Sequence, residues 1–271
     1  MNLKQMKLDI LDISKKKIGE VNLPTQFQED VRADLVKRAF LAFRSNKRQA
    51  YGTKPEAGKR SSSILSKRRR KYRGMYGFGI SRTPRKILSR RGTRMFWVGA
   101  FSPNTVGGRR AHPPKAEKIL EKKINKKEMN IALTSAISAT ANEKEMKKKY
   151  ERLKDKKIEM KNLPFIVESK IISLKTKNLL ESLKKIFGKD LFDIALKKKK
   201  VRSGKGKLRG RKYKSNAGML LVTGKNEEMK TKLFEISNTN NLSVTDLAKG
   251  TQGRLVIYTE QAIKDLGEKF K

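Results

Sequence analysis

The segment GRLVIYTEQAIKDLGEKF, residues 253–270, decides the fold class because it joins two different patterns. It opens with a short, nearly continuous apolar run, Leu255 to Tyr258, which is typical of a strand buried on both faces. The remainder mixes polar and apolar residues in the manner of an amphipathic helix. A strand that leads directly into a helix is the repeating unit of α/β domains.

The same alternation continues through residues 161–271. Strands are predicted for LPFIVES (163–169), GMLLVTG (218–224) and, at a sheet edge, LSVTDL (242–247). Helices are predicted for LKTKNLLESLKKIFG (174–188), ending at Gly188, for KDLFDIALKKKK (189–200) and for EEMKTKLFEISNTN (227–240). Near-continuous apolar strands that alternate with helices indicate a single, mostly parallel sheet with helices on both faces.

The amino-terminal part adds to this domain. Residues 6–23 alternate apolar and polar side chains and predict two short strands around a Lys-rich turn. A helix is predicted from Thr25, where Thr25 and Gln28 have capping-box spacing, and its apolar stripe runs from Phe27 to Phe43. Residues 113–160 predict polar helices after Pro113 and Pro114. We therefore expect one globular α/β domain made of residues 1–49 and 113–271.

Residues 50–112 interrupt this domain and differ from it in kind. They hold 17 Lys and Arg residues but only one acid, Glu56, and glycines and aromatic residues are spread among them. Neither helical nor strand periodicity persists, so we predict a long basic internal extension without regular structure. Arg and Lys suit phosphates, and aromatic rings stack on bases. This composition predicts an arm that folds on RNA and packs its apolar groups into RNA.

The charge of the whole chain supports a polyanionic partner. Its 68 Lys and Arg residues outnumber 26 Asp and Glu residues, giving a formal net charge of +42. Nucleic acid is the leading candidate, and an anionic membrane surface is the alternative. No apolar run approaches the roughly 20 residues that span a bilayer. The absence of cysteine excludes disulfides, Cys-ligated zinc and thiol nucleophiles.

No motif in the chain predicts catalysis. GTKPEAGKRS (52–61) resembles a phosphate-binding P-loop, but five residues separate its glycines and Arg60 occupies the Ser or Thr position. The only histidine, His112, lies next to two prolines without a second His or a Cys, so it predicts RNA or backbone contact instead of metal binding. We therefore expect that the protein is not an enzyme and that it binds neither a metal of its own nor a cofactor. Structural Mg²⁺ associated with the RNA is the one exception.

Two basic segments hold the candidate RNA-binding residues, the extension and a Gly-punctuated loop at 197–218. In the extension the candidates are Arg68, Arg69, Arg70, Tyr72, Arg73, Arg82, Arg85, Arg90, Arg91, Arg94, Phe96, Trp97, Arg109, Arg110 and His112. In the second loop they are Lys205, Lys207, Arg209, Arg211, Lys212 and Tyr213.

Three motifs resemble a known family. VGGRRAHPPKAEK (106–118), GISRTPRK (79–86) and KLRGRKYKSNAGMLLV (207–222) are similar to signatures of the fourth large-subunit ribosomal protein family in its archaeal and eukaryotic branch. The resemblance implies an α/β domain on the outer face of the subunit and an extension threaded through rRNA, with its tip, near 86–98, at the wall of the peptide exit tunnel. Unlike many members, this chain has Met95, Phe96 and Trp97 there. It also lacks the long carboxy-terminal extension of eukaryotic members, which favours an archaeal source.

The function implied is that of a structural constituent of the large ribosomal subunit in the cytoplasm. Its expected partners are large-subunit rRNA, neighbouring ribosomal proteins and the nascent peptide, with neither a membrane nor a second copy of the chain. Two alternatives stay open: an RNA-modifying or RNA-cleaving enzyme with a basic arm, and a regulator that binds RNA away from the ribosome.

Overall fold

The computed structural model describes residues 6–60, 63–153 and 162–270. The chain divides into two compact units, which we call the globular unit (Met1–Asn46 with Glu121–Lys271) and the extension unit (Lys47–Leu120). Within the described ranges, no helix is both long enough and apolar enough to cross a membrane.

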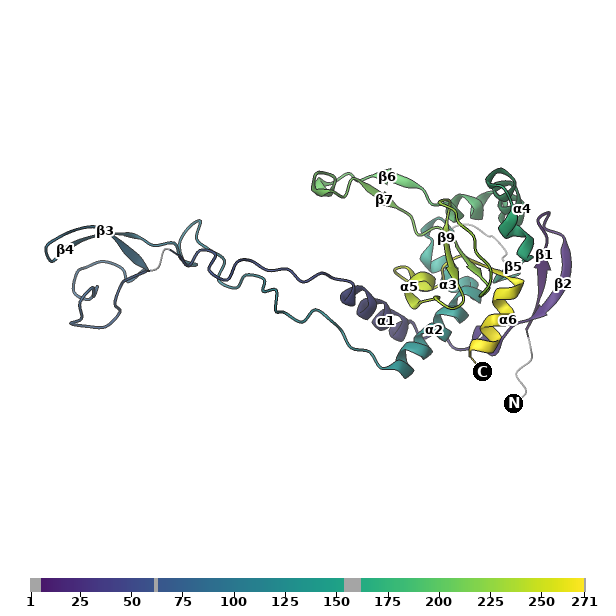
Figure 1. Cartoon of the computed structure of the whole chain (residues 1–271), viewed down its shortest axis with the longest axis horizontal. Helices are drawn as coiled ribbons and strands as arrows, with labels where there is room; N and C mark the ends of the chain where they lie inside the picture. The colour runs from purple at the N-terminus through teal and green to yellow at the C-terminus, as the bar shows by residue number, and fades with distance from the viewer. Residues whose placement is uncertain (1–5, 61–62, 154–161, 271) are drawn as a thin grey trace. The chain divides into compact units, whose positions relative to one another are not determined.

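A six-stranded sheet forms the centre of the globular unit (Figure 1). In the order in which they pair, its strands are β2 (Lys17–Asn22), β1 (Lys7–Leu11), β5 (Phe165–Val167), β10 (Val256–Thr259), β8 (Leu220–Thr223) and β9 (Glu235–Asn238). The strands β1 and β2 form an antiparallel hairpin, and every other neighbouring pair is parallel. The predicted mostly parallel sheet is therefore confirmed.

Successive residues of the central strands enter two separate cores. On β10, Val256 and Tyr258 pack in the first core, whereas Ile257 packs in the second. On β5, Ile166 belongs to the first core and Phe165 and Val167 to the second. Side chains alternate across a strand, so a strand covered on both faces needs apolar residues at every position. This is why its sequence is a nearly continuous apolar run.

Helices cover both faces, as predicted. The helices whose buried residues join the first core are α1 (Ala33–Asn46), α2 (Lys126–Ala141), α5 (Val244–Ala248) and α6 (Glu260–Lys269). The second core is covered by α3 (Glu143–Lys149) and α4 (Thr176–Ala195). The helix α4 is broken at Gly188, whose φ of 71° and ψ of 177° are not helical. The predicted end of one helix at Gly188 and the start of a second are thus confirmed.

The prediction of a continuous helix from Thr25 is wrong. Thr25–Gln28 is a 3-10 helix, Glu29 is extended, and α1 begins only at Ala33. The hydroxyl of Ser135 accepts a hydrogen bond from the Arg32 amide at 2.6 Å and donates one to the Asp30 carbonyl at 3.3 Å. These contacts from α2 satisfy backbone groups of residues 30–32 that would otherwise pair within a helix. The contact with α2 therefore outweighs the capping-box spacing of Thr25 and Gln28.

Two predictions near the carboxy terminus are also wrong. The expected helix at 227–240 contains β9, and the expected edge strand at 242–247 overlaps α5, which runs from Val244 to Ala248. Ser243 and Asp246 form a capping box that starts α5, and β9 takes the edge position beside β8.

Between Pro113 and Ala141 only α2 is helical, and residues 154–160 of the predicted helix lie outside the described residues.

A buried arginine joins three parts of the globular unit. Arg254 is fully buried before β10, and its guanidinium lies 2.9 Å from Glu235 of β9. It donates to the carbonyls of Ala217 (2.7 Å), Gly218 (3.2 Å), Met219 (3.0 Å) and Asp246 (2.7 Å). A buried charge requires this degree of pairing, because an unpaired one costs several kcal/mol or more. Burial alone would raise the pKa of Glu235, but Lys249 and Arg254 hold it below its ordinary value.

The residue before Arg254 has room for no side chain. Gly253 has a φ of +78°, and a Cβ there would lie 2.5 Å from the backbone of Glu145 in α3. We expect Gly253→Ala to lower the free energy of unfolding by about 3 kcal/mol, combining left-handed strain with overpacking. Gly250→Ala is the matched control, because Gly250 also has a positive φ (+106°) but open space around it. Urea unfolding measures both, and equal losses would refute the role of the close contact.

Candidate RNA-binding surfaces

The outgoing and returning chains of the extension unit are joined by a few contacts. The Thr53 amide donates to the Pro114 carbonyl at 3.2 Å, and the Ala100 amide donates to the Pro84 carbonyl at 2.9 Å. Gly58 packs so closely between Phe101 and Arg109 that a Cβ would lie 2.8 Å and 2.7 Å from their side chains. These contacts bring residues 53–58 and 84 beside residues 100–114.

The expectation that the extension lacks regular structure is wrong for residues 85–99. Here β3 (Arg85–Arg91) and β4 (Arg94–Gly99) form an antiparallel hairpin whose two-residue turn includes Gly92, with a φ of 60°. The register shifts between Ile87 and Ser89. A bulge of this kind breaks the two-residue alternation by which a strand is recognised in sequence.

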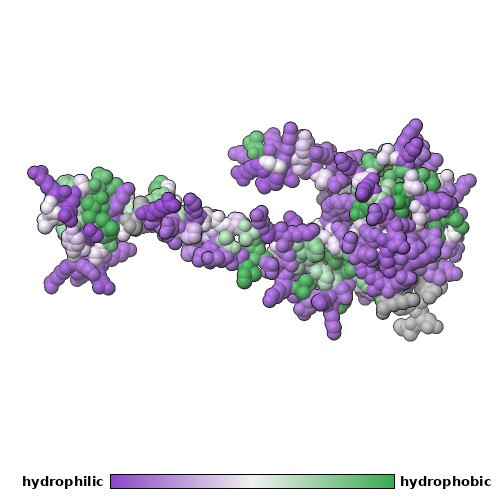
Figure 2. Space-filling model, viewed as in Figure 1, coloured by the Kyte–Doolittle hydropathy of each residue, from purple (hydrophilic) through white to green (hydrophobic). Residues whose placement is uncertain are grey.

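The hairpin separates the roles of its aromatic residues. Trp97 lies opposite Ile87 and is half-buried, so the hairpin itself shields part of the indole. Phe96 is 46% exposed, and Leu88, at the bulge, is 71% exposed. Figure 2 shows hydrophobic groups at this end of the extension unit among hydrophilic ones. The expectation that these apolar groups pack only into RNA is therefore too broad, because Trp97 already has a protein neighbour.

Arginines lie over the aromatic rings of the extension unit. Arg69 and Arg82 lie 5.4 and 4.9 Å from the ring centre of Tyr76, and Arg82 also donates to the Tyr76 hydroxyl at 2.7 Å. The same arrangement joins Arg73 to Tyr72 (5.2 Å) and Arg94 to Phe96 (5.4 Å). These pairs hold a flat apolar surface next to a positive charge before any partner binds.

Two of the arginines have a left-handed backbone. Arg70 and Arg73 have φ angles of 49° and 61° in a turn that is closed by a hydrogen bond of 2.9 Å from the Ser66 amide to the Arg73 carbonyl. Left-handed geometry costs a non-glycine residue about 1–2 kcal/mol. Strain of this kind is concentrated at functional sites, and this turn carries the exposed basic run of residues 67–71.

Most of the candidate residues of the extension are exposed to solvent. The exposed set is Arg68, Arg69, Arg70, Tyr72, Arg82, Arg90, Arg91, Arg94, Phe96, Arg110 and His112. The half-buried set is Arg73, Arg85, Trp97 and Arg109.

The second basic loop is an ordered hairpin of the globular unit. Its strands are β6 (Lys199–Val201) and β7 (Tyr213–Ser215), and Figure 1 shows them projecting from the sheet. Asn216 fixes its base by donating to the Leu196 carbonyl at 2.8 Å and accepting from the Lys198 amide at 2.6 Å. The six candidate residues in this hairpin, all exposed, are Lys205, Lys207, Arg209, Arg211, Lys212 and Tyr213.

The carboxyl ends of the parallel strands, where α/β enzymes bind their ligands, are filled by protein. Glu227 accepts hydrogen bonds from the Gly224 amide at 2.7 Å and the Thr259 hydroxyl at 2.6 Å. Asp265 accepts from the Lys225 amide at 2.6 Å and is buried. Both carboxylates are thus used internally. Within the described part of the chain, no three His, Asp or Glu side chains come together as a metal site.

Comparison with known proteins agrees with this arrangement. The family model described as "Ribosomal protein L4/L1 family" matches residues 21–269. The chain belongs to the ribosomal protein L4/L1 family. It is 40% identical to the large ribosomal subunit protein uL4 of Nanoarchaeum equitans, over 97% of this chain and 98% of that protein. It is 37% identical to uL4 of Methanocaldococcus jannaschii, over 98% and 100%, and 34% identical to that of Methanosphaera stadtmanae, over 98% of each. The resemblance seen in the sequence motifs is confirmed.

This family member has a further basic region that the sequence patterns did not reveal. Lys148 and Lys149 of α3, Arg152, Lys200 of β6, and Lys214 of β7 line one cavity of the globular unit. They come from segments far apart in sequence, so no motif or run of charge connects them. Only the fold brings them together.

One lysine of this cavity is expected to titrate near neutrality. Burial, followed by repulsion from Arg254 and Lys249, lowers the pKa of Lys149 from 10.5 to about 7. The folded state therefore prefers the neutral amine, and stability is lost as the pH falls from 10.5 to about 7. We expect the Cε resonance of Lys149 to show an NMR titration midpoint near pH 7 that disappears in Lys149→Gln. A midpoint close to 10.5 would contradict this burial.

Proposed function

We propose that this protein is a structural constituent of the large ribosomal subunit that binds and scaffolds large-subunit rRNA without catalysing a reaction. The observation that carries the proposal is the extension, where 17 basic residues face a single acid and exposed aromatic rings lie beside arginines. The relatives that match it over nearly their full length are named as large-subunit proteins. Its partners in this role are rRNA and neighbouring ribosomal proteins.

Binding in this proposal depends on RNA shape as well as charge. Side chains do not reach the bases in the deep, narrow major groove of A-form RNA, so recognition falls on phosphates, loops and unstacked bases. Exposed Tyr72 and Phe96 supply rings for unstacked bases, and the surrounding arginines supply charge for phosphates. The β6–β7 hairpin is proposed as the second contact, through its exposed lysines and arginines.

The hairpin β3–β4 is proposed to form part of the peptide exit tunnel wall. This finer role rests on the family resemblance and on the position of residues 86–98 at the turn of the extension. Crosslinks from residues 86–98 of the intact subunit to RNA and to a stalled nascent peptide would support it. Crosslinks to RNA alone would limit the hairpin to scaffolding.

Magnesium is proposed to enter only with the RNA. Its expected ligands are rRNA phosphates, because the described residues bring together no group of three carboxylate or imidazole side chains. The protein is also proposed to act as a single copy per subunit and not as a homo-oligomer.

Sedimentation separates this function from the alternatives. A structural constituent is expected to sediment with large subunits after a moderate salt wash, at about one copy per particle. An RNA-processing enzyme or a free regulator would be substoichiometric or wash off, which would overturn the proposal. As a second readout, proteases should cut the extension in the isolated protein but not in the subunit.

A further inference from the structure

The globular unit contains a cavity at the end of the sheet opposite the filled carboxyl ends. It has a volume of about 670 Å³ and is lined by the end of α3 and the following turn, the end of α4, the base of the β6–β7 hairpin and the loop after α5. Two of the residues that line the cavity, Ala217 and Thr251, lie in the chain just before β8 and β10. The cavity is therefore at the amino ends of these two strands. A volume of this size accommodates a small ligand.

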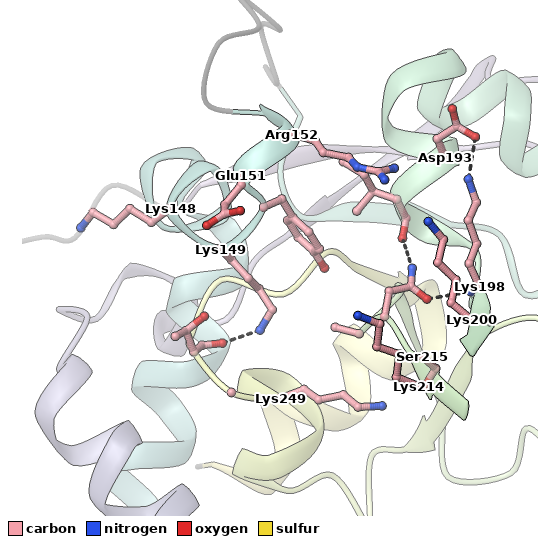
Figure 3. A pocket seen from close by; sticks show the side chains of 16 residues that line it. Lys148, Lys149, Glu151, Arg152, Asp193, Lys198, Lys200, Lys214, Ser215 and Lys249 are labelled. Atoms are coloured by element: carbon pink, nitrogen blue, oxygen red, sulfur yellow. Dashed lines mark hydrogen bonds and ion pairs between the residues drawn. The ribbon is translucent and has the colours of Figure 1, made fainter. Parts of the chain in front are cut away.

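The cavity holds more positive charge than the protein neutralises. Seven Lys and Arg side chains line it against two acids, Asp193 and Glu151. Lys198 pairs with Asp193 at 3.1 Å, Lys249 pairs with Glu235, and Lys148 pairs with Glu145. By contrast, no acid among the described residues pairs with Arg152, Lys200 or Lys214 (Figure 3). Unpaired cations that converge on one hollow repel each other, and an anion placed between them removes that repulsion.

Part of the cavity wall is apolar and rigid. Tyr150 lines it, and its hydroxyl is fixed by accepting from the Leu255 amide at 3.1 Å and donating to the Gly218 carbonyl at 3.3 Å. Ile194 and Ala217 line it as well. A wall that contains a fixed aromatic ring suits a flat, apolar group, in addition to the anion that the charges require.

A bound anion would favour the protonated, positively charged form of Lys149. Its ammonium donates to the carbonyl of Ala248 at 2.9 Å and to that of Thr251. The charged groups that face it are Arg254 and Lys249, both positive, and these lie against Glu235. A bound phosphate would offset the two positive neighbours, so ligand binding and protonation of Lys149 would favour each other.

We propose that this cavity binds one unstacked nucleotide of RNA, with its phosphate among Arg152, Lys200 and Lys214 and its base against Tyr150. The proposal rests on the proposed rRNA-binding function and adds a defined pocket on the globular unit. A nucleotide meets both requirements, a negative group and a flat ring, whereas an acidic peptide meets only the first. Binding in a pocket for one unstacked base depends on the shape of the pocket, whereas binding to a charged surface depends on charge alone.

The first test fills the cavity without changing charge. Ser215→Tyr and Ala217→Leu each enlarge a side chain that lines it. We expect either change in the full-length protein to weaken binding to large-subunit rRNA by about tenfold, the size of one lost base-stacking contact. Asn178→Tyr, at an exposed position of α4 outside the cavity and both proposed RNA contacts, is the matched control and should leave affinity within about twofold.

The second test removes charge. The triple variant Arg152→Gln/Lys200→Gln/Lys214→Gln should weaken binding more than Lys184→Gln/Lys185→Gln/Lys189→Gln, which removes three exposed charges from α4. Circular dichroism and urea unfolding of every variant establish that the fold is retained. If the two triple variants lose equal affinity and both filling variants bind as wild type does, the pocket is refuted while rRNA binding stands. If the wild-type protein itself fails to bind rRNA, the proposed function fails with it.

The third test uses small probes and distinguishes a site for a nucleotide of RNA from a site for a free nucleotide. Adenosine monophosphate and inorganic phosphate are titrated into the full-length protein while the Lys149 Cε resonance is followed. Both probes should raise its titration midpoint, and the nucleotide should do so at lower concentration because it also contacts Tyr150. Saturation by the nucleotide at micromolar concentration would instead indicate a site for a free nucleotide. A response to neither probe, with unchanged rRNA binding by the filling variants, would overturn the proposal.

Discussion

Replacing Arg90, Arg91 and Arg94 together by glutamine is expected to weaken rRNA binding by about 100-fold at about 0.1 M salt. All three side chains are exposed on the β3–β4 hairpin, on both sides of its turn. Each phosphate contact to a single strand contributes about 0.7 to the slope of log affinity against log salt, so three lost contacts lower the slope by about two. Filter binding over a salt series measures both affinity and slope.

The control for this variant removes the same charge from a different surface. Lys184→Gln/Lys185→Gln/Lys189→Gln changes three exposed lysines of α4 and keeps the hairpin intact. We expect it to reduce the salt slope by less than one. If both variants reduce the slope equally, the hairpin arginines act only through net charge, and the proposed phosphate contacts are refuted.

Arg254→Met is expected to lower the free energy of unfolding by about 3–5 kcal/mol, the range for removing one partner of a buried ion pair. The change leaves four carbonyl groups without their donor and removes one cation from Glu235, which keeps Lys249 and Lys197. Methionine fills similar space, so the loss reflects polar groups and not a cavity. Chemical unfolding followed by circular dichroism measures the change.

Two further variants define the cause. Arg209→Met removes the same charge from an exposed site and should change stability by less than about 0.5 kcal/mol. Arg254→Lys keeps the charge but lacks the planar group that reaches several carbonyls, so its stability should lie between those of wild type and Arg254→Met. A loss below about 1 kcal/mol in Arg254→Met would show that water satisfies the stranded groups.

Three predicted elements differ from the structure, and each difference has a physical reason. The start of α1 was displaced because Ser135 of a distant helix binds the backbone of residues 30–32. The residues of β9 were mistaken for a helix because an edge strand with half-buried side chains carries no clear two-residue pattern. The β3–β4 hairpin was missed because its bulge shifts the register. In the first case a contact distant in sequence outweighed a local preference, whereas in the other two the strands carry no regular alternation of apolar and polar residues.

The sequence by itself determined the α/β class, the two-sided burial of the central strands and the basic character of residues 50–112. These depend on the type and spacing of residues close together in the chain. Only the tertiary structure decided that Trp97 is half-buried, that Arg254 pairs with Glu235, and that Arg152, Lys200 and Lys214 share a cavity. Arg254 and the cavity residues meet through chain reversals whose geometry is set by the packing of the whole core, and no local pattern encodes that packing. The half-burial of Trp97 depends on the bulged register of the β3–β4 hairpin, which no regular alternation marks in the sequence.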